Sequence, residues 1–429
     1  MTLRRVMLIV TMILLVAGST AVGMVAADWP FWKRMIALAQ LQDGGEWPES
    51  FYQPVARIEG QPAPFFPTAA PAELSIEPAA LEAAAAWADA NNTVALLVLH
   101  RGKLQLERYW RGMTVDGYFS GRAMSRSLVG LIYGQAVAEG KLALDDAAGK
   151  YLPEWRGDPR AVITIRQLLL NQSGLEELSP NAVQLPPNAT TWQRAVAFAS
   201  GAFTKNTRLA LGTDFGAAAL SLDLQHEPGG RFAFSNANAQ ILGVILERAT
   251  GEPFESYFEQ KLWRPAGAGV GEFYMDRDGG MPAVYCCFRA TPRDFLRVGA
   301  LLVNDGQIDG RAVLPAGWVA EMTRGSPINP LYGFQIWRGK ARAGVREYMS
   351  GSGQGIRHGE DFVADDVIWM EGGGGRTLWA IPSQQLVILR LGRASPGWDP
   401  SVLPNTLLRG LRAAATSTPR DTSAASRAR

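Results

Sequence analysis

The chain has 429 residues, of which 47% are hydrophobic and 19% are charged, a composition typical of a folded globular protein. This length suits one large two-lobed domain or two domains. A formal net charge of +2 gives no electrostatic argument for nucleic-acid binding, and three His with two Cys leave no convincing metal cluster.

Residues 1–27 form a separate unit. Arg4 and Arg5 precede a largely apolar run, 6–27, of about 22 residues, which is long enough to span a bilayer. The small residues at 25–27 (VAA) also suit a signal-peptide cleavage site. A membrane anchor and a cleaved signal both export the rest of the chain, because the positive end stays in the cytoplasm. We therefore expect a periplasmic or extracytoplasmic domain, held at the inner membrane if the segment is retained.

The next segments lead into a sheet. Residues 28–78 are rich in Trp, Pro and Gly, and we expect them to form an extended lead that packs on the following domain. Residues 81–90 (LEAAAAWADA) favour a helix. Residues 94–100 and 103–110 flank the dipeptide RG at 101–102, a pattern that predicts a β-hairpin.

Residues 119–155 are the most informative stretch. Apolar residues at three- and four-residue spacings predict a buried helix that begins near Ala123 and stops at Gly140. The chain then runs through EGKLALDD to KYLPEW, within residues 139–155. The apolar positions of the helix are Met124, Leu128, Leu131, Ile132, Ala136 and Val137.

Two later segments also predict helices. In residues 163–175 (ITIRQLLLNQSGL), Thr164 is placed to cap a short helix. Residues 231–268 begin RFAFSNANAQ and continue into a helix, expected over 240–250, that a glycine terminates.

The last patterned segment is 368–392 (IWMEGGGGRTLWAIPSQQLVILRLG). It predicts two strands around a turn at 382–384, which would join the earlier hairpin in one antiparallel sheet. Residues 416–429 are small and polar, and we expect them to be disordered.

Cys286 and Cys287 are the only cysteines. Neighbouring cysteines can bond only through a strained eight-membered ring, so we expect two buried thiols that act as small hydrophobes. An exported chain of this size can fold without a stapling disulfide.

Residues 119–155, 163–175, 231–268 and 368–392 together resemble the serine β-lactamase-related family. This family includes class C β-lactamases, penicillin-binding proteins and 6-aminohexanoate-dimer hydrolases. The resemblance implies an α/β (α+β) fold of the serine β-lactamase/DD-peptidase type, in which helices flank an antiparallel sheet and a helical lobe is inserted. With the segments assigned from composition, the expected organisation is a leader (1–27), a Pro/Trp-rich lead (28–78), the β-lactamase-related domain (79–395) and a C-terminal tail (396–429), largely disordered at its end. The resemblance places a helical lobe near 176–230 within the domain.

The resemblance also shows that the catalytic positions of the family are altered. Relatives carry S-x-x-K-S at the start of the helix, where this chain has Ala123 for the nucleophilic Ser and Arg126 for Lys, and retains Ser127. Relatives carry Y-S-N or Y-x-N in the second motif, where this chain has Phe234 for Tyr and retains Asn236. Ser to Ala and Tyr to Phe each remove one oxygen and keep the shape. The motifs therefore predict the fold better than they predict activity.

Hydrolysis at such a site needs a Ser oxygen, a neutral Lys or a Tyr phenolate that takes its proton, and backbone N–H groups that hold the oxyanion. Arg126 cannot serve as that base because an arginine guanidinium keeps its proton at neutral pH. The third motif of relatives, K-T-G or H-x-G, is replaced by a glycine run at 372–375, and Arg376 follows where relatives often have Gln. The residues that we expect near the pocket are Ser120, Ser127, Gly373, Gly374, Gly375 and Arg376.

Three functional hypotheses remain open. In the first, Arg126 and the free N–H groups of the helix start bind a carboxylate-bearing amide or peptide without hydrolysing it. In the second, Arg126 pairs with an internal carboxylate and the pocket has decayed. In the third, the chain is an active amidase or esterase of the 6-aminohexanoate-dimer-hydrolase type that uses a relocated Ser120 or Ser127. Ser125 should face away from Ala123, and no G-x-S-x-G elbow supports an α/β-hydrolase. We favour a non-catalytic member, and the sequence implies no cofactor, no metal and no nucleic-acid partner.

Overall fold

The computed structural model describes residues 25–39, 49–177 and 204–412, together with residues 12, 19, 22, 23 and 190. Most of the predicted leader, the middle of the predicted helical lobe and the end of the predicted tail lie outside these ranges. Within the described residues, no helix is both long enough and apolar enough to cross a membrane.

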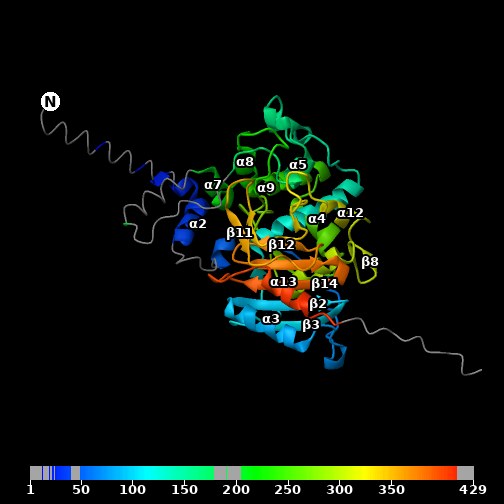
Figure 1. Cartoon of the computed structure of the whole chain (residues 1–429). Coiled ribbons are helices and arrows are strands. Elements are labelled where there is room, and N and C mark those ends of the chain that lie inside the picture. Colours follow the sequence, from blue (N-terminus) through cyan, green and yellow to red (C-terminus); the bar gives the residue numbers. More distant parts are fainter. Residues whose placement is uncertain are drawn as a thin grey trace, which may run out of the picture.

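A six-stranded antiparallel sheet with the strand order β3-β2-β14-β13-β12-β9 lies between α3 and the helices at the opposite end of the molecule (Figure 1). The predicted hairpin is confirmed: Arg101 and Gly102 both take positive φ, 50° and 73°, which matches a tight two-residue connection. The predicted strands on either side of the turn at 382–384 are confirmed as β13 and β14, and β14 pairs with β2 as expected. Residues 368–372 form a third strand, β12, because the glycine run interrupts the first predicted strand. The strands are β2 (Thr93–His100), β3 (Lys103–Tyr109), β9 (Trp337–Arg338), β12 (Ile368–Gly372), β13 (Arg376–Ile381) and β14 (Leu386–Gly392).

The two faces of the sheet bury separate hydrophobic clusters, because successive side chains of a strand point to opposite faces. Leu97 belongs to the cluster that contains residues of α4 and α11, whereas its neighbour Leu96 belongs to the cluster that contains residues of α3 and α13. The predicted core residues Leu128 and Leu131 of α4 have no exposed surface. The helices that cover the sheet are α3 (Pro78–Ala90), α4 (Ser125–Ala138), α11 (Pro292–Val303) and α13 (Val402–Arg409). The last of these lies in the stretch that we had assigned to the tail.

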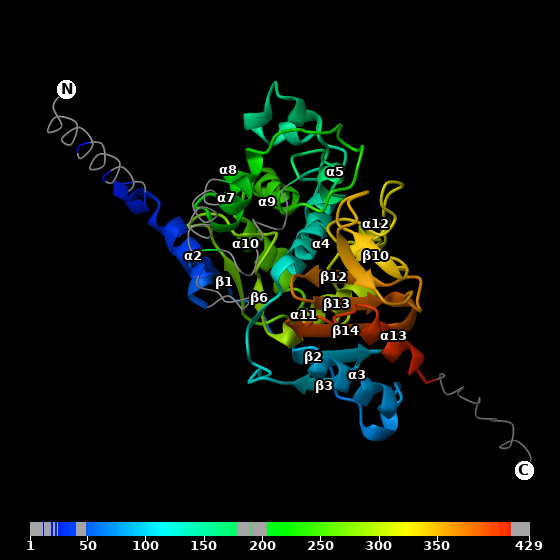
Figure 2. The ribbon, with the colours of Figure 1, turned by 60° about the vertical axis from the view of Figure 1, so that its left-hand side comes forward.

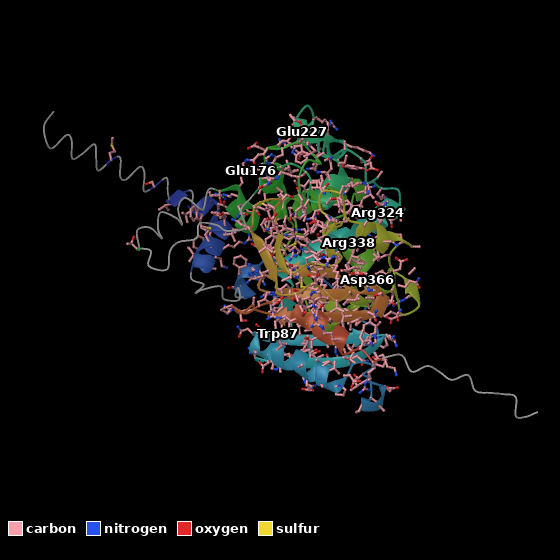
Figure 3. The ribbon with its side chains drawn as sticks, in the orientation of Figure 1. Trp87, Glu176, Glu227, Arg324, Arg338 and Asp366 are labelled. Carbon is pink, nitrogen blue, oxygen red and sulfur yellow. A yellow bond between two sulfur atoms is a disulfide. The ribbon has the colours of Figure 1, made fainter. Side chains whose placement is uncertain are left out.

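Several other helices, including α5, α8 and α9, gather at the end of the molecule away from α3 (Figures 1 and 2). Figure 3 marks these two ends with Glu227 and Trp87. The predicted cap at Thr164 is confirmed, because its hydroxyl accepts from the Gln167 N–H and the Gln167 side chain accepts from the Thr164 N–H. These helices are α5 (Ile165–Leu169), α7 (Lys205–Leu211), α8 (Phe215–Leu220), α9 (Asn236–Thr250), α10 (Phe254–Phe258) and α12 (Trp318–Met322).

The lead packs on the domain through a helix and a strand. In α2 (Trp29–Ala39), Arg34 is 4% exposed, and its guanidinium donates to five backbone carbonyl groups. These carbonyl groups belong to Gln53, Leu211, Gly212, Met275 and Asp276. The strand β1 (Val55–Ile58) joins a second sheet of order β1-β5-β6-β4. Its other strands are β4 (Phe119–Ser120), β5 (Gly271–Tyr274) and β6 (Arg289–Ala290). Two small antiparallel pairs lie outside both sheets: β7 (Gln307–Ile308) with β8 (Arg311–Ala312), and β10 (Gly344–Glu347) with β11 (Gly355–His358).

Candidate functional site

The segment that leads into α4 positions Ala123. A short 3₁₀ turn, η3 (Arg122–Met124), follows β4, so the α-helix itself begins at Ser125, two residues after the predicted start. The cause is Arg122, whose φ of 47° is left-handed and interrupts a regular helix. Ala123 is partly exposed at this break. Arg126 follows three residues later, and residues at this spacing lie on the same side of a helical turn.

Arg126 is the charged centre of the site. Its side chain is 2% exposed, donates a hydrogen bond from Nη2 to Oδ1 of Asn236, and stacks its guanidinium 3.7 Å from the ring centroid of Phe234. Nε and Nη1 are buried without a hydrogen-bond partner. Burial lowers the pKa of Arg126. No carboxylate of the described residues forms an ion pair with it, and the field of Glu371 and the nearby Tyr332 hydroxyl offset its charge only in part.

The second motif lies at the start of α9. Asn236 is its first residue, four residues before the predicted helix start, and Ser235 occupies the N-cap position. The Phe234 N–H donates to the carbonyl of Tyr348 at 2.8 Å, and the two rings lie 5.2 Å apart between centroids. The structure thus brings Arg126, Phe234 and Asn236 together, as the family resemblance implies.

Neither candidate for a relocated nucleophile lies next to a base. Ser127 is 1% exposed, and its hydroxyl donates to the backbone carbonyl of Gln335 at 2.7 Å. Ser120 is 3% exposed rather than at the pocket mouth, and its hydroxyl accepts from the Arg122 N–H at 3.2 Å. Ser125 has no exposed surface, and its hydroxyl donates to the Arg122 carbonyl at 2.8 Å. All three serines have structural hydrogen bonds within the described part of the chain.

The glycine run forms a wall beside η3. Gly372 ends β12, and a Cβ atom there would collide with the carbonyl oxygen of Gly121. Gly374 and Gly375 take φ values of 81° and 73°, which favour glycine. Arg376 is 1% exposed, donates to the Gly373 carbonyl, and lies 4.8 Å from the ring centroid of Phe119. Arg376 therefore supports the run from behind.

Sequence reasoning missed three residues next to this site. Glu371, in β12, forms an ion pair with Arg346 of β10 and accepts a hydrogen bond from the Tyr348 hydroxyl at 2.7 Å. Burial raises the pKa of Tyr348 well above its ordinary value, so the phenol stays protonated. Glu371 could have been found from the sequence, because it is a single carboxylate within an apolar strand, directly before the glycine run.

The vicinal cysteines correct one of our expectations. The structure joins Cys286 and Cys287 in a disulfide instead of leaving two buried thiols. Cys287 takes a φ of 76°, and this turn of the backbone brings the two side chains together. Among the residues that the structure describes, no three His, Cys, Asp or Glu side chains gather as a metal-binding set.

The serine β-lactamase and DD-peptidase class of fold has an antiparallel sheet covered by helices. In this class, as here, the start of the helix with the first motif lies beside a glycine-rich strand end. The family model described as Beta-lactamase matches residues 79–404, so the chain belongs to the β-lactamase family.

Solved structures agree on this fold. A Bacillus anthracis protein assigned as a 6-aminohexanoate-dimer hydrolase superposes with a TM-score of 0.60 at 19% identity, over 84% of this chain and 89% of that chain. The octameric penicillin-binding protein homologue from Pyrococcus abyssi gives a TM-score of 0.53 at 17% identity, over 76% of each chain.

Curated relatives cover less of the chain. The 6-aminohexanoate-dimer hydrolase of Paenarthrobacter ureafaciens is 26% identical over 245 residues, which are 54% of this chain and 57% of the relative. Protein flp of Staphylococcus aureus is 26% identical over 181 residues, which are 40% of this chain and 32% of flp. The chain therefore spans about a third of the length of flp and little more than half of the hydrolase.

Proposed function

We propose that this β-lactamase-family protein is an exported, catalytically degenerate member that binds a carboxylate-bearing amide or peptide without hydrolysing it. The observation that carries the proposal is the buried guanidinium of Arg126, whose nitrogen atoms Nε and Nη1 have no hydrogen-bond partner and which forms no ion pair with a carboxylate among the described residues. Burying an uncompensated charge is costly, and an anionic ligand would offset that cost.

The groups near Ala123 supply no nucleophile with a base. Ala123 has no hydroxyl, and an arginine does not release its proton at neutral pH. Phe234 has no phenol, and the neighbouring Tyr348 already donates its hydroxyl to Glu371. A serine nucleophile requires an adjacent base for activation, and within the described residues the hydroxyl groups of the three nearby serines hydrogen-bond to backbone groups instead.

The charges around Arg126 favour a ligand with one negative charge. Arg126 and Arg346 supply two positive charges, and Glu371, whose field acts on both of them, supplies one negative charge. Burial lowers the pKa of His358, beside Arg346, to about 4, so this imidazole is neutral at pH 7. One positive charge therefore remains for a carboxylate. The relative from Paenarthrobacter ureafaciens is named for 6-aminohexanoate dimer, which is a carboxylate-bearing amide.

Binding to the full-length protein in detergent tests the proposal. N-acetylglycine and the linear 6-aminohexanoate dimer should bind, whereas N-acetylglycinamide, which lacks the carboxylate, should bind at least about tenfold more weakly because one charged hydrogen bond is lost. Arg126→Met should weaken N-acetylglycine binding by about tenfold to a hundredfold for the same reason. Arg311→Met, at an exposed site in β8, is the matched control and should bind normally.

Two results would contradict this proposal. Equal affinity for the acid and the amide, or an unchanged affinity in Arg126→Met, would remove Arg126 as the recognition group. Turnover of the probes or of p-nitrophenyl acetate, with burst kinetics abolished by Ser120→Ala or Ser127→Ala, would instead establish the alternative of an active amidase or esterase with a relocated nucleophile.

The proposed export rests on Arg4, Arg5 and the apolar run 6–27. A fusion of residues 1–40 to alkaline phosphatase, which is active only after export, should be active. Fractionation of the full-length protein should then place it with the inner membrane if the run is an anchor, or in the periplasm if it is cleaved. An inactive fusion together with a protein in the soluble cytoplasmic fraction would contradict export.

A further inference from the structure

The turn that carries the vicinal disulfide lies directly against the backbone of the candidate site. The Cys287 N–H donates to the Arg122 carbonyl at 3.0 Å, and the Gly121 N–H donates to the Phe288 carbonyl at 3.0 Å. The Phe288 N–H donates to the Ser125 hydroxyl at 2.9 Å, and that hydroxyl donates to the Arg122 carbonyl. The turn therefore holds both ends of the segment 121–125, which contains Ala123.

Both partners in this contact have unusual backbone conformations. Arg122 and Cys287 take φ values of 47° and 76°, in the left-handed region that residues with a side chain rarely adopt. Such conformations persist only where the surrounding structure imposes them. At Cys287 the imposing element is covalent, because the disulfide closes a small ring with Cys286 across one peptide bond. At Arg122 the carbonyl accepts two hydrogen bonds, from the Cys287 N–H and from the Ser125 hydroxyl.

We propose that the Cys286–Cys287 disulfide is a redox switch that fixes the backbone of residues 121–125 and thereby sets the affinity of the anion site at Ala123 and Arg126. In the oxidised form the ring holds Cys287 in the left-handed conformation, in which its N–H donates to the Arg122 carbonyl. Once the ring opens, nothing covalent keeps Cys287 left-handed, and its hydrogen bond to the Arg122 carbonyl is lost. The effect on affinity rests on the proposed function, whereas the effect on the backbone does not.

The chemistry is a thiol–disulfide exchange with a dithiol reductant. A thiolate of the dithiol attacks Sγ of Cys286, which is half-buried, and releases the thiolate of Cys287, which is 1% exposed and takes up a proton. The second thiol of the reductant then displaces Cys286 as a thiol and forms the disulfide of the oxidised reductant. Two electrons and two protons pass from the dithiol to the cysteine pair.

The test compares oxidised and dithiothreitol-reduced full-length protein in detergent. The chain has no other cysteine, so the reductant can act only at this pair. We expect two titratable thiols after reduction of the folded protein, and faster amide hydrogen exchange in residues 121–126. Exchange in the buried middle of α9 should not change. We also expect about tenfold weaker binding of N-acetylglycine, the order that loss of one backbone hydrogen bond at a binding loop produces.

The double substitution Cys286→Ser, Cys287→Ser should match the reduced wild type and should not respond to dithiothreitol. A disulfide that resists reduction in the folded protein, or equal hydrogen exchange at 121–126 in both forms, would overturn the switch. If exchange changes but N-acetylglycine binds neither form, the backbone part of the switch stands and the proposed ligand class fails. If N-acetylglycine binds both forms equally, the proposed function stands and the coupling of the disulfide to affinity fails.

Discussion

Replacement of Arg126 by methionine distinguishes a ligand-binding arginine from one that neutralises an internal acid. Arg126→Met removes the charge and keeps an unbranched, apolar side chain in a fully buried position. An arginine in a buried ion pair would destabilise the fold by about 3–5 kcal/mol when removed, because it would leave its carboxylate uncompensated. The structure shows no such carboxylate among the described residues, so we expect a different outcome.

The expected change can be summed from the contacts of Arg126. The substitution removes the cost of an uncompensated buried charge, about 3–5 kcal/mol. It loses one charge-assisted hydrogen bond to Asn236, about 1.5–3 kcal/mol, and one buried cation–π contact with Phe234, about 2 kcal/mol. Asn236 is half-buried, so water can reach its amide after the substitution. The free energy of unfolding should therefore stay within about 2 kcal/mol of wild type.

Urea denaturation of the full-length wild type and Arg126→Met in detergent measures this difference. N-acetylglycine at a hundred times its dissociation constant should add about 2.7 kcal/mol to the wild type and almost nothing to the variant. A loss of 3–5 kcal/mol in the variant without ligand would refute the reasoning, since it would reveal a carboxylate paired with Arg126.

Three further predictions concern the core, the chemistry and the pH dependence. Leu128→Ala, at a position with no exposed surface, should lower the free energy of unfolding by about 2–5 kcal/mol in urea denaturation, and a loss below about 0.5 kcal/mol would mean that the helix face is wrong. The triple change Ala123→Ser, Arg126→Lys, Phe234→Tyr should give a burst of p-nitrophenol from p-nitrophenyl acetate that each single change lacks, because catalytic residues act as a unit; a burst from the wild type would contradict this. His358 has a pKa of about 4 in the fold because burial disfavours its charged form, whereas the unfolded chain protonates near pH 6.5. The stability that His358 contributes is therefore present above about pH 6.5 and is lost as the pH falls to 4, by about 3 kcal/mol in all. His358→Gln should flatten the dependence of the free energy of unfolding on pH in this range. An unchanged slope would contradict the assignment to His358.

Local patterns predicted the elements of the fold, because each depended on neighbouring residues. The hairpin followed from two strand-forming runs on either side of residues 101–102, and the cap of α5 followed from Thr164. The start of α4 was placed two residues too early, because a left-handed φ at Arg122 leaves no trace in an apolar pattern.

The candidate site required contacts between distant segments. Arg126 and Asn236 are 110 residues apart in sequence, and only the family resemblance brought them together. Neither the sequence pattern nor the resemblance predicted the ion pair of Arg346 with Glu371, because an arginine in a short polar strand is typical of an exposed surface position. The state of Cys286 and Cys287 depends on the φ of a single residue, which the sequence does not specify.

The close approach of Gly372 to Gly121 has a consequence for redesign of the pocket. A lysine or histidine for the third motif cannot be installed at residue 372, because any side chain there would push the strand away from the helix start. At Gly373 a new Cβ atom would meet only the Cδ atom of Arg122, at 3.8 Å, which is ordinary van der Waals contact. A lysine or histidine intended to restore general-acid chemistry at this wall should therefore be introduced at Gly373, one residue after the position that excludes any side chain.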